Sequence, residues 1–112
     1  MQAIYKDLQN AELIVFVSPI YYYNFSAQLK KVIDRFYAID EELHTKKEVI
    51  LLATAYNDEE KVTKPIQVEL EAICEYFKWN IKGEVLALGC GEPEDIIKTK
   101  YLEKAYNLGK NI

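Results

Sequence analysis

The chain has 112 residues, half of them hydrophobic, with 18 acidic and 14 basic side chains and a net charge of −4. A chain of this length is expected to form one domain over residues 1–112. The acidic balance argues against a nucleic-acid partner, which selects basic surfaces. No apolar run approaches the ~20 residues that span a bilayer, and the amino terminus lacks signal-peptide order, so we expect a cytoplasmic protein without a membrane partner.

Cysteine and histidine are too scarce to suggest metal chemistry. Two cysteines and one histidine cannot complete a four-ligand zinc or iron–sulfur site within one chain. Cys74 has apolar neighbours and is interpreted as a core residue, Cys90 as part of a turn, and His44 as a surface residue. The sequence therefore predicts no metal site, and no paired acid and base or nucleophile–histidine pair is recognisable.

The first third of the chain predicts a helix, a strand and a second helix. Apolar residues from Met1 to Ala11 recur at helical spacing. Residues 13–17 are apolar at every position, which is typical of a parallel strand covered on both faces. Pro19 ends this strand because proline has no amide hydrogen. Ser26 is a suitable N-cap for a following amphipathic helix.

The remaining elements continue the alternation. A polar loop up to Lys47 leads to an apolar strand expected at residues 48–54. A helix that begins near Thr63 then leads to a further apolar strand, expected at residues 82–88. A last helix is expected from Thr99 to Leu108, with Gly109 just beyond its end. This order predicts an α/β fold with three parallel strands, right-handed crossovers and helices alternating between the two faces.

The stretch from the first strand into the second helix resembles the second cofactor loop of the flavodoxin-like NAD(P)H-dependent FMN reductases, including the iron–sulfur flavoprotein group. That family carries a Ser-Pro-x-Tyr turn, a short loop, a small residue pair with Gln-Leu-Lys, and then Ile-Asp-Arg. The matching positions here are Ser18, Pro19, Tyr21, Ser26, Ala27, Gln28, Leu29, Lys30, Ile33, Asp34 and Arg35. The cysteines that bind a cluster in iron–sulfur flavoproteins have no counterpart.

The resemblance implies a flavodoxin-like three-layer α/β/α fold with a parallel sheet. It covers the carboxyl-terminal two-thirds or so of the family's domain, so the family's first strand, phosphate-binding loop, helix and second strand would precede Met1. We therefore expect an N-terminally truncated domain that binds FMN weakly or not at all by itself. NAD(P)H would be the co-substrate of an FMN-dependent oxidoreductase, or of a fragment of one.

The resemblance also implies which residues would hold the flavin. Ser18 and Asn24 belong to the first loop, in which Pro19, Ile20 and Tyr21 would offer backbone groups to the ring edge. A wall near the substrate side would be formed by the aromatic residues Tyr22, Tyr23 and Phe25. The pyrimidine end would meet a further loop, which consists of Thr54, Ala55 and Tyr56.

Two other interpretations of these loops remain open. The tyrosines can instead form an aromatic contact surface between subunits, because tyrosine is enriched at interfaces. The stretch from Thr54 to Asp58, taken alone, is a turn. The alternative function is accordingly a non-catalytic domain that serves only in association.

The first strand also bears on assembly. Without the two preceding strands of the family, Leu13–Val17 would form an edge of the sheet, and it carries no lysine or proline of the kind that discourages edge pairing. We expect a homodimer or higher assembly through this edge and its flanking helices. The alternative is a separate chain that supplies the missing amino-terminal half.

Overall fold

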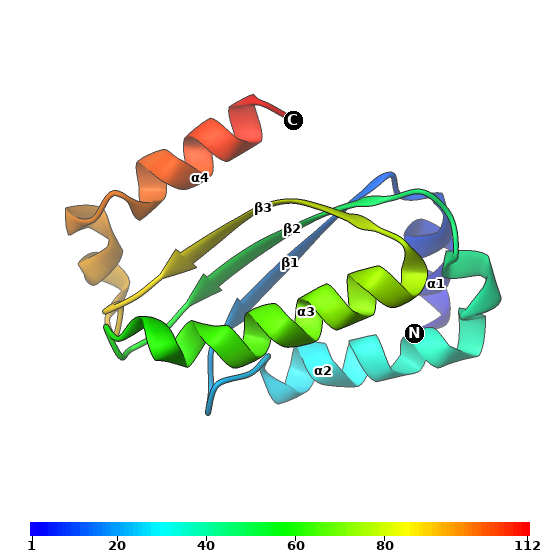
Figure 1. Ribbon diagram of the computed structural model, residues 1–112, viewed down its shortest axis with the longest axis horizontal. Coiled ribbons are helices and arrows are strands. Elements are labelled where there is room, and N and C mark those ends of the chain that lie inside the picture. The colour runs from blue at the N-terminus through cyan, green and yellow to red at the C-terminus, as the bar shows by residue number, and fades with distance from the viewer.

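The computed structural model describes residues 1–112, apart from the side chain of Lys98. Its sheet contains three parallel strands in the order β1 (Leu13–Pro19), β2 (Glu48–Thr54) and β3 (Asn80–Ala87). The helices of the described residues are α1 (Gln2–Asn10), α2 (Ala27–Asp34), α3 (Lys64–Phe77) and α4 (Tyr101–Lys110), as Figure 1 shows. The predicted three-layer α/β/α fold with a parallel sheet is confirmed.

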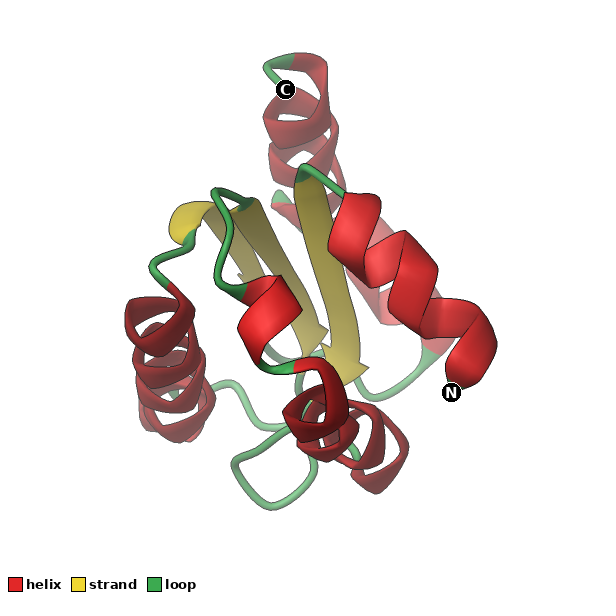
Figure 2. Ribbon diagram, turned by 90° about the vertical axis from the view of Figure 1, so that its right-hand side faces the viewer, coloured by secondary structure: helices red, strands yellow, loops and turns green.

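The helices do not alternate between the faces, so that prediction was wrong. Helices α2 and α3 lie together on one face, whereas α4 covers the opposite face (Figure 1). The reason is the strand order: both crossovers move across the sheet in the same direction, and right-handed crossovers then place their helices on the same side. Helix α1 lies beside β1 at its amino end (Figures 1 and 2).

The main core lies between the sheet and the helices α2 and α3. Leu51 of β2, Ile66 and Leu70 of α3 and Leu43 of a connecting turn are fully buried. The complete cluster of buried apolar residues is Phe16, Phe25, Ile33, Phe36, Leu43, Val49, Leu51, Ala53, Ile66, Leu70, Cys74, Phe77 and Trp79. Cys74 is thus a core residue, as expected.

The connection between α2 and β2 is more ordered than the expected polar loop. It contains two 3₁₀ turns, Arg35–Ile39 and Glu41–Leu43. Lys47 is only 2% exposed, and its ammonium group donates to two carbonyls at the carboxyl-terminal end of α1, that of Gln9 (3.0 Å) and that of the C-cap residue Ala11 (2.6 Å). A cation at the carboxyl-terminal end of a helix is favourable, so this lysine joins α1 to the sheet.

Two glycine positions differ in their roles. Gly109 lies inside α4, which continues to Lys110, so its predicted place beyond the helix was wrong. A Cβ atom added to Gly83 would lie only 2.6 Å from Cδ1 of Leu108 in α4. A side chain at this position of β3 would displace the end of the Leu108 side chain, because α4 packs closely onto the strand. An extra residue, Lys82, also shifts the register between β2 and β3 just before it.

Candidate functional site

The loops that follow the three strands meet at the carboxyl edge of the sheet. The Ile20 amide donates to the Thr54 carbonyl (2.7 Å), which joins the loop after β1 to the end of β2. The Cys90 amide donates to the Ala55 carbonyl (2.8 Å), which joins the loop after β3 to that after β2. The structure therefore brings the predicted loops together and adds a third that was interpreted only as a turn. Parallel strands ending at one edge are the signal that could have identified it.

The loop after β1 reverses direction in a tight turn that projects beyond the sheet (Figure 1). Tyr21 and Asn24 exchange two backbone hydrogen bonds of 3.2 Å, and between them Tyr22 and Tyr23 have φ angles of 47° and 74°. Positive φ at both central positions is the pattern of a type I′ turn, which normally selects asparagine and glycine. Two tyrosines here hold strain of about 1–3 kcal/mol each, a feature that clusters at functional sites.

Ser18 fixes the base of this loop. Its hydroxyl oxygen accepts a hydrogen bond from the Ser26 amide (2.9 Å) and donates its proton to the Pro19 carbonyl (2.7 Å). Ser18 is 2% exposed, so these bonds are shielded from water. Ser26 in turn caps α2, because its side chain accepts from the Leu29 amide. One buried hydroxyl thus sets the distance between the end of β1 and the start of α2.

Aromatic side chains of the loop divide between surface and core. Tyr21 and Tyr23 are exposed and Tyr22 is 97% exposed. Phe25 instead is buried and its ring centroid lies 6.3 Å from that of Phe16, so it cannot contribute a wall beside a ligand. The Asn24 side chain is also committed, because its oxygen accepts from the Phe25 amide (2.7 Å).

Several backbone amides at this edge are available to a ligand. Within the part of the chain that the structure describes, no acceptor is found for the amides of Tyr22, Tyr23 or Tyr56. The Ile20 and Tyr21 amides, by contrast, are used by Thr54 and Asn24. The free backbone amides of the first loop are therefore those of its two turn tyrosines.

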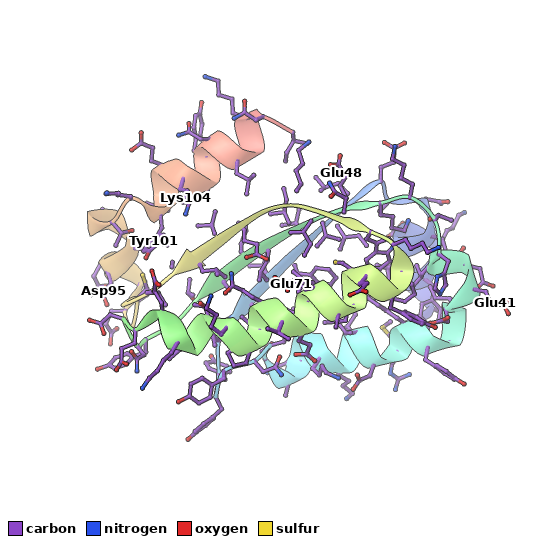
Figure 3. All side chains as sticks on the ribbon, in the orientation of Figure 1. Glu41, Glu48, Glu71, Asp95, Tyr101 and Lys104 are labelled. Atoms are coloured by element: carbon purple, nitrogen blue, oxygen red, sulfur yellow. The ribbon has the colours of Figure 1, made fainter. Side chains whose placement is uncertain are left out.

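The loops after β2 and β3 form an acidic cavity. Its volume is about 510 Å³, and its lining includes Tyr56, Asp58, Glu59 and Asp95. The Tyr56 ring rests on Gly91, and a side chain at position 91 would displace the ring. Asp95, labelled in Figure 3 at the end of the molecule to which the strands point, accepts from the amides of Gly91 (3.1 Å) and Glu92 (2.9 Å).

The cysteine of this region is not activated. Burial, together with the nearby Asp95 carboxylate, raises the pKa of the Cys90 thiol above its ordinary value. A raised pKa reduces the thiolate fraction at neutral pH, and the thiolate is the reactive species. Among the described residues no three metal-ligating side chains cluster, and no helix is long and apolar enough to cross a membrane.

Two solved structures share this fold. The Trp repressor binding protein from Bacillus subtilis has a TM-score of 0.84 and 23% sequence identity, over 96% of this chain and 74% of its own. A flavone reductase has a TM-score of 0.75 and 14% identity, over 99% of this chain and 44% of its own. No curated protein matches the sequence.

The family itself is shown by the sequence rather than by these folds. The family model described as NADPH-dependent FMN reductase matches residues 1–88, which include β1, β2, β3 and all the loop residues predicted to bind the flavin. The match confirms the resemblance found around Ser18 and Pro19 and the flavodoxin-like character of the fold. With its sheet, its strand-end loops and this match in agreement, the chain belongs to the NADPH-dependent FMN reductase family.

Proposed function

We propose that this chain holds the ring of a flavin at the carboxyl edge of its sheet and takes part in FMN-dependent oxidation of NAD(P)H. The observation that carries the proposal is the set of unpartnered amides of Tyr22, Tyr23 and Tyr56 beside exposed tyrosine rings. A flavin ring edge accepts hydrogen bonds, and its faces pack on aromatic side chains. Family membership supports both FMN and a nicotinamide co-substrate.

The chemical step would come from the bound flavin, which accepts and returns a hydride; the protein supplies binding, orientation and electrostatics. The turn amides of Tyr22 and Tyr23 would hold one ring edge, and the Tyr56 amide the pyrimidine end. Ser18 would keep the first loop at a fixed distance from α2, so that these donors stay aligned. No side chain of this edge needs to transfer a proton in this proposal.

The same edge is a poor place for the phosphate of FMN. A phosphate near the acidic cavity would face the carboxylates of Asp58, Glu59 and Asp95. Like charges at short range raise the free energy of the bound state. The described residues therefore fit the neutral ring and not the dianionic tail, and we expect weak binding in which the phosphate contributes little.

Titration with FMN and with riboflavin, followed by quenching of flavin fluorescence, tests this proposal. We expect the two ligands to bind with similar, weak affinity, because riboflavin has the ring but no phosphate. A preference for FMN of more than tenfold, about 1.4 kcal/mol, would contradict the proposed ring-only contact. A sub-micromolar dissociation constant for FMN would mean that the phosphate has its own anchor.

A pair of variants locates the bound ring. Tyr22→Ala should weaken riboflavin binding, because it removes an exposed ring next to the free amides. Tyr37→Ala is the matched control, since Tyr37 is 86% exposed on the connection after α2, at the other end of that helix. Equal effects of the two substitutions would show that the flavin does not bind at the strand-end loops.

A non-catalytic role in association is the second candidate. It is supported by the exposed edge and face of β1, where Val15 and Val17 are 44% and 65% exposed. If neither flavin binds at any accessible concentration while the chain still assembles, association is the remaining function.

A further inference from the structure

The residues on either side of Tyr56 are tied to the loop that follows β3. The Ala55 carbonyl accepts a hydrogen bond from the Cys90 amide (2.8 Å), and the Asn57 carbonyl accepts one from the Gly89 amide (3.1 Å). Tyr56 lies between these two anchored residues, and among the described residues no acceptor is found for its own amide. The loop after β3 therefore holds the backbone around a free donor without using that donor itself.

The direction of the neighbouring backbone groups indicates the side to which the Tyr56 amide is directed. Consecutive residues of an extended chain direct their amide and carbonyl groups to opposite sides. The Thr54 carbonyl accepts from the Ile20 amide in the loop after β1 (2.7 Å). The Ala55 amide instead donates to the Ala87 carbonyl of β3 (2.8 Å). Because both neighbours of Tyr56 bond toward β3 and its loop, the Tyr56 amide is directed to the opposite side, that of the loop after β1.

The shape of the anchoring loop depends on one glycine. Gly89 has a φ of 68°, in the left-handed region that residues with a side chain rarely adopt. This conformation lets the two successive amides of Gly89 and Cys90 both donate to the loop after β2. A Cβ added to Gly89 would lie 3.6 Å from Cβ of Asp58, which is an ordinary contact. Backbone conformation, and not space, is therefore what selects glycine at position 89.

We propose that Gly89 is a positioning residue for the flavin. Its left-handed conformation holds Ala55 and Asn57, and these two residues fix the Tyr56 amide so that it donates to the pyrimidine end of the ring. This role rests on the proposed function, because it concerns a donor of the same site. Gly89 has no side chain and its amide is already used, so it acts through the loop after β2 rather than on the ligand.

The free amides of the site are held by two separate devices. Those of Tyr22 and Tyr23 lie in a turn whose base is fixed by the buried hydroxyl of Ser18. The Tyr56 amide is held instead by the hydrogen bonds from the loop after β3. A change at Gly89 should therefore disturb one donor of the site and leave the other two in place, whereas general destabilisation of the fold would affect all three.

Titration of isotopically labelled protein with riboflavin, followed by NMR through individual amide resonances, tests this role. In the unmodified chain the amides of Tyr22, Tyr23 and Tyr56 should all shift. Gly89→Ala should strongly reduce the shift of the Tyr56 amide at saturation and preserve the other two. It should also weaken riboflavin binding by about fivefold, the loss expected for one neutral hydrogen bond. Gly89→Asn should retain the Tyr56 shift, because asparagine tolerates the left-handed conformation.

Gly109→Ala is the matched control, because it makes the same substitution in α4, where no atom lies within 4 Å of the added Cβ. It should leave all three amide shifts unchanged. The positioning role is overturned if Gly89→Ala leaves the Tyr56 shift intact, if it reduces all three shifts equally, or if Gly89→Asn behaves like Gly89→Ala. Failure of the proposed function gives a different result, since the unmodified chain would then show no shift at any of the three amides, and the positioning role would fail with it.

Discussion

Replacement of Ser18 by alanine is the most direct test of how the strand-end loops are held. The hydroxyl of Ser18 is the acceptor for the Ser26 amide and the donor to the Pro19 carbonyl. Alanine leaves the Ser26 amide buried without an acceptor, since Ser26 is only 8% exposed. An unsatisfied buried donor costs about 1–3 kcal/mol. We therefore expect Ser18→Ala to lower the free energy of unfolding by about 2 kcal/mol.

Urea denaturation followed by tryptophan fluorescence measures this change, because the chain's one tryptophan, Trp79, lies in the core. The melting temperature should fall by roughly 10 °C, given about 4–8 °C per kcal/mol for a domain of this size. Riboflavin binding should weaken as well, because the turn amides lose their fixed position. This second effect depends on the proposed function, whereas the first does not.

Ser26→Ala provides the control at the other end of the same contact. It removes the N-cap of α2, whose hydrogen bond to the Leu29 amide is long at 3.3 Å, and it leaves the Ser26 amide bonded to Ser18. Loss of a cap of this kind costs about 1 kcal/mol. If Ser26→Ala destabilises the protein more than Ser18→Ala, or if Ser18→Ala is neutral, the reasoning about the buried hydroxyl is refuted.

Three further predictions concern other parts of the fold. Lys47→Met should lower the free energy of unfolding by about 1–3 kcal/mol and speed amide hydrogen exchange in α1, because the carbonyls of Gln9 and Ala11 lose a charged donor. An unchanged exchange rate would contradict the idea that Lys47 holds α1 in place. Burial raises the pKa of the Cys74 thiol to about 11, whereas the thiol of the unfolded chain ionises at its ordinary value, so the protein should lose about 2–3 kcal/mol of stability as the pH rises from about 8.5 to 11. Urea titrations at a series of pH values measure this slope, and Cys74→Ala should flatten it. Tyr23→Gly should raise the melting temperature, because the turn strain of about 1–3 kcal/mol that it relieves exceeds the roughly 0.5–1 kcal/mol entropic cost of glycine, while riboflavin binding falls. A lower melting temperature would show that the φ of 74° is unstrained.

The sequence predicted the elements well because their patterns are local. The continuous apolar runs of β1 and β2 and the helical spacing in α3 determine the type of element without tertiary information. The faces that the helices cover depend on strand order, which no local pattern records. The burial of Lys47 depends on its contact with the end of α1, and Lys47 lies 36 residues along the chain from its acceptor Ala11. These features were accordingly missed.

The candidate site was predicted in its position and only partly in its details. Ser18 and Pro19 at the end of an apolar run correctly placed a loop at the carboxyl edge of the sheet. The sequence could not show that Phe25 packs on Phe16, because an aromatic residue in a loop can turn either way. The positive φ angles of Tyr22 and Tyr23 were also unpredictable, since such turns normally contain asparagine or glycine.

The uneven division of the core has a consequence for how this protein can change by mutation. The buried side chains of the four α-helices belong to α2 and α3, whereas α1 and α4 contribute none. Substitutions on the α2 and α3 side of the sheet create cavities at a cost of about 2–5 kcal/mol for a large aliphatic residue. Substitutions on the α4 side, such as at Leu102 or Tyr106, remove little buried area. Mutational tolerance is therefore concentrated on the layer that faces the open side of β1, so that surface can diverge between related proteins while the sheet and its strand-end loops remain folded.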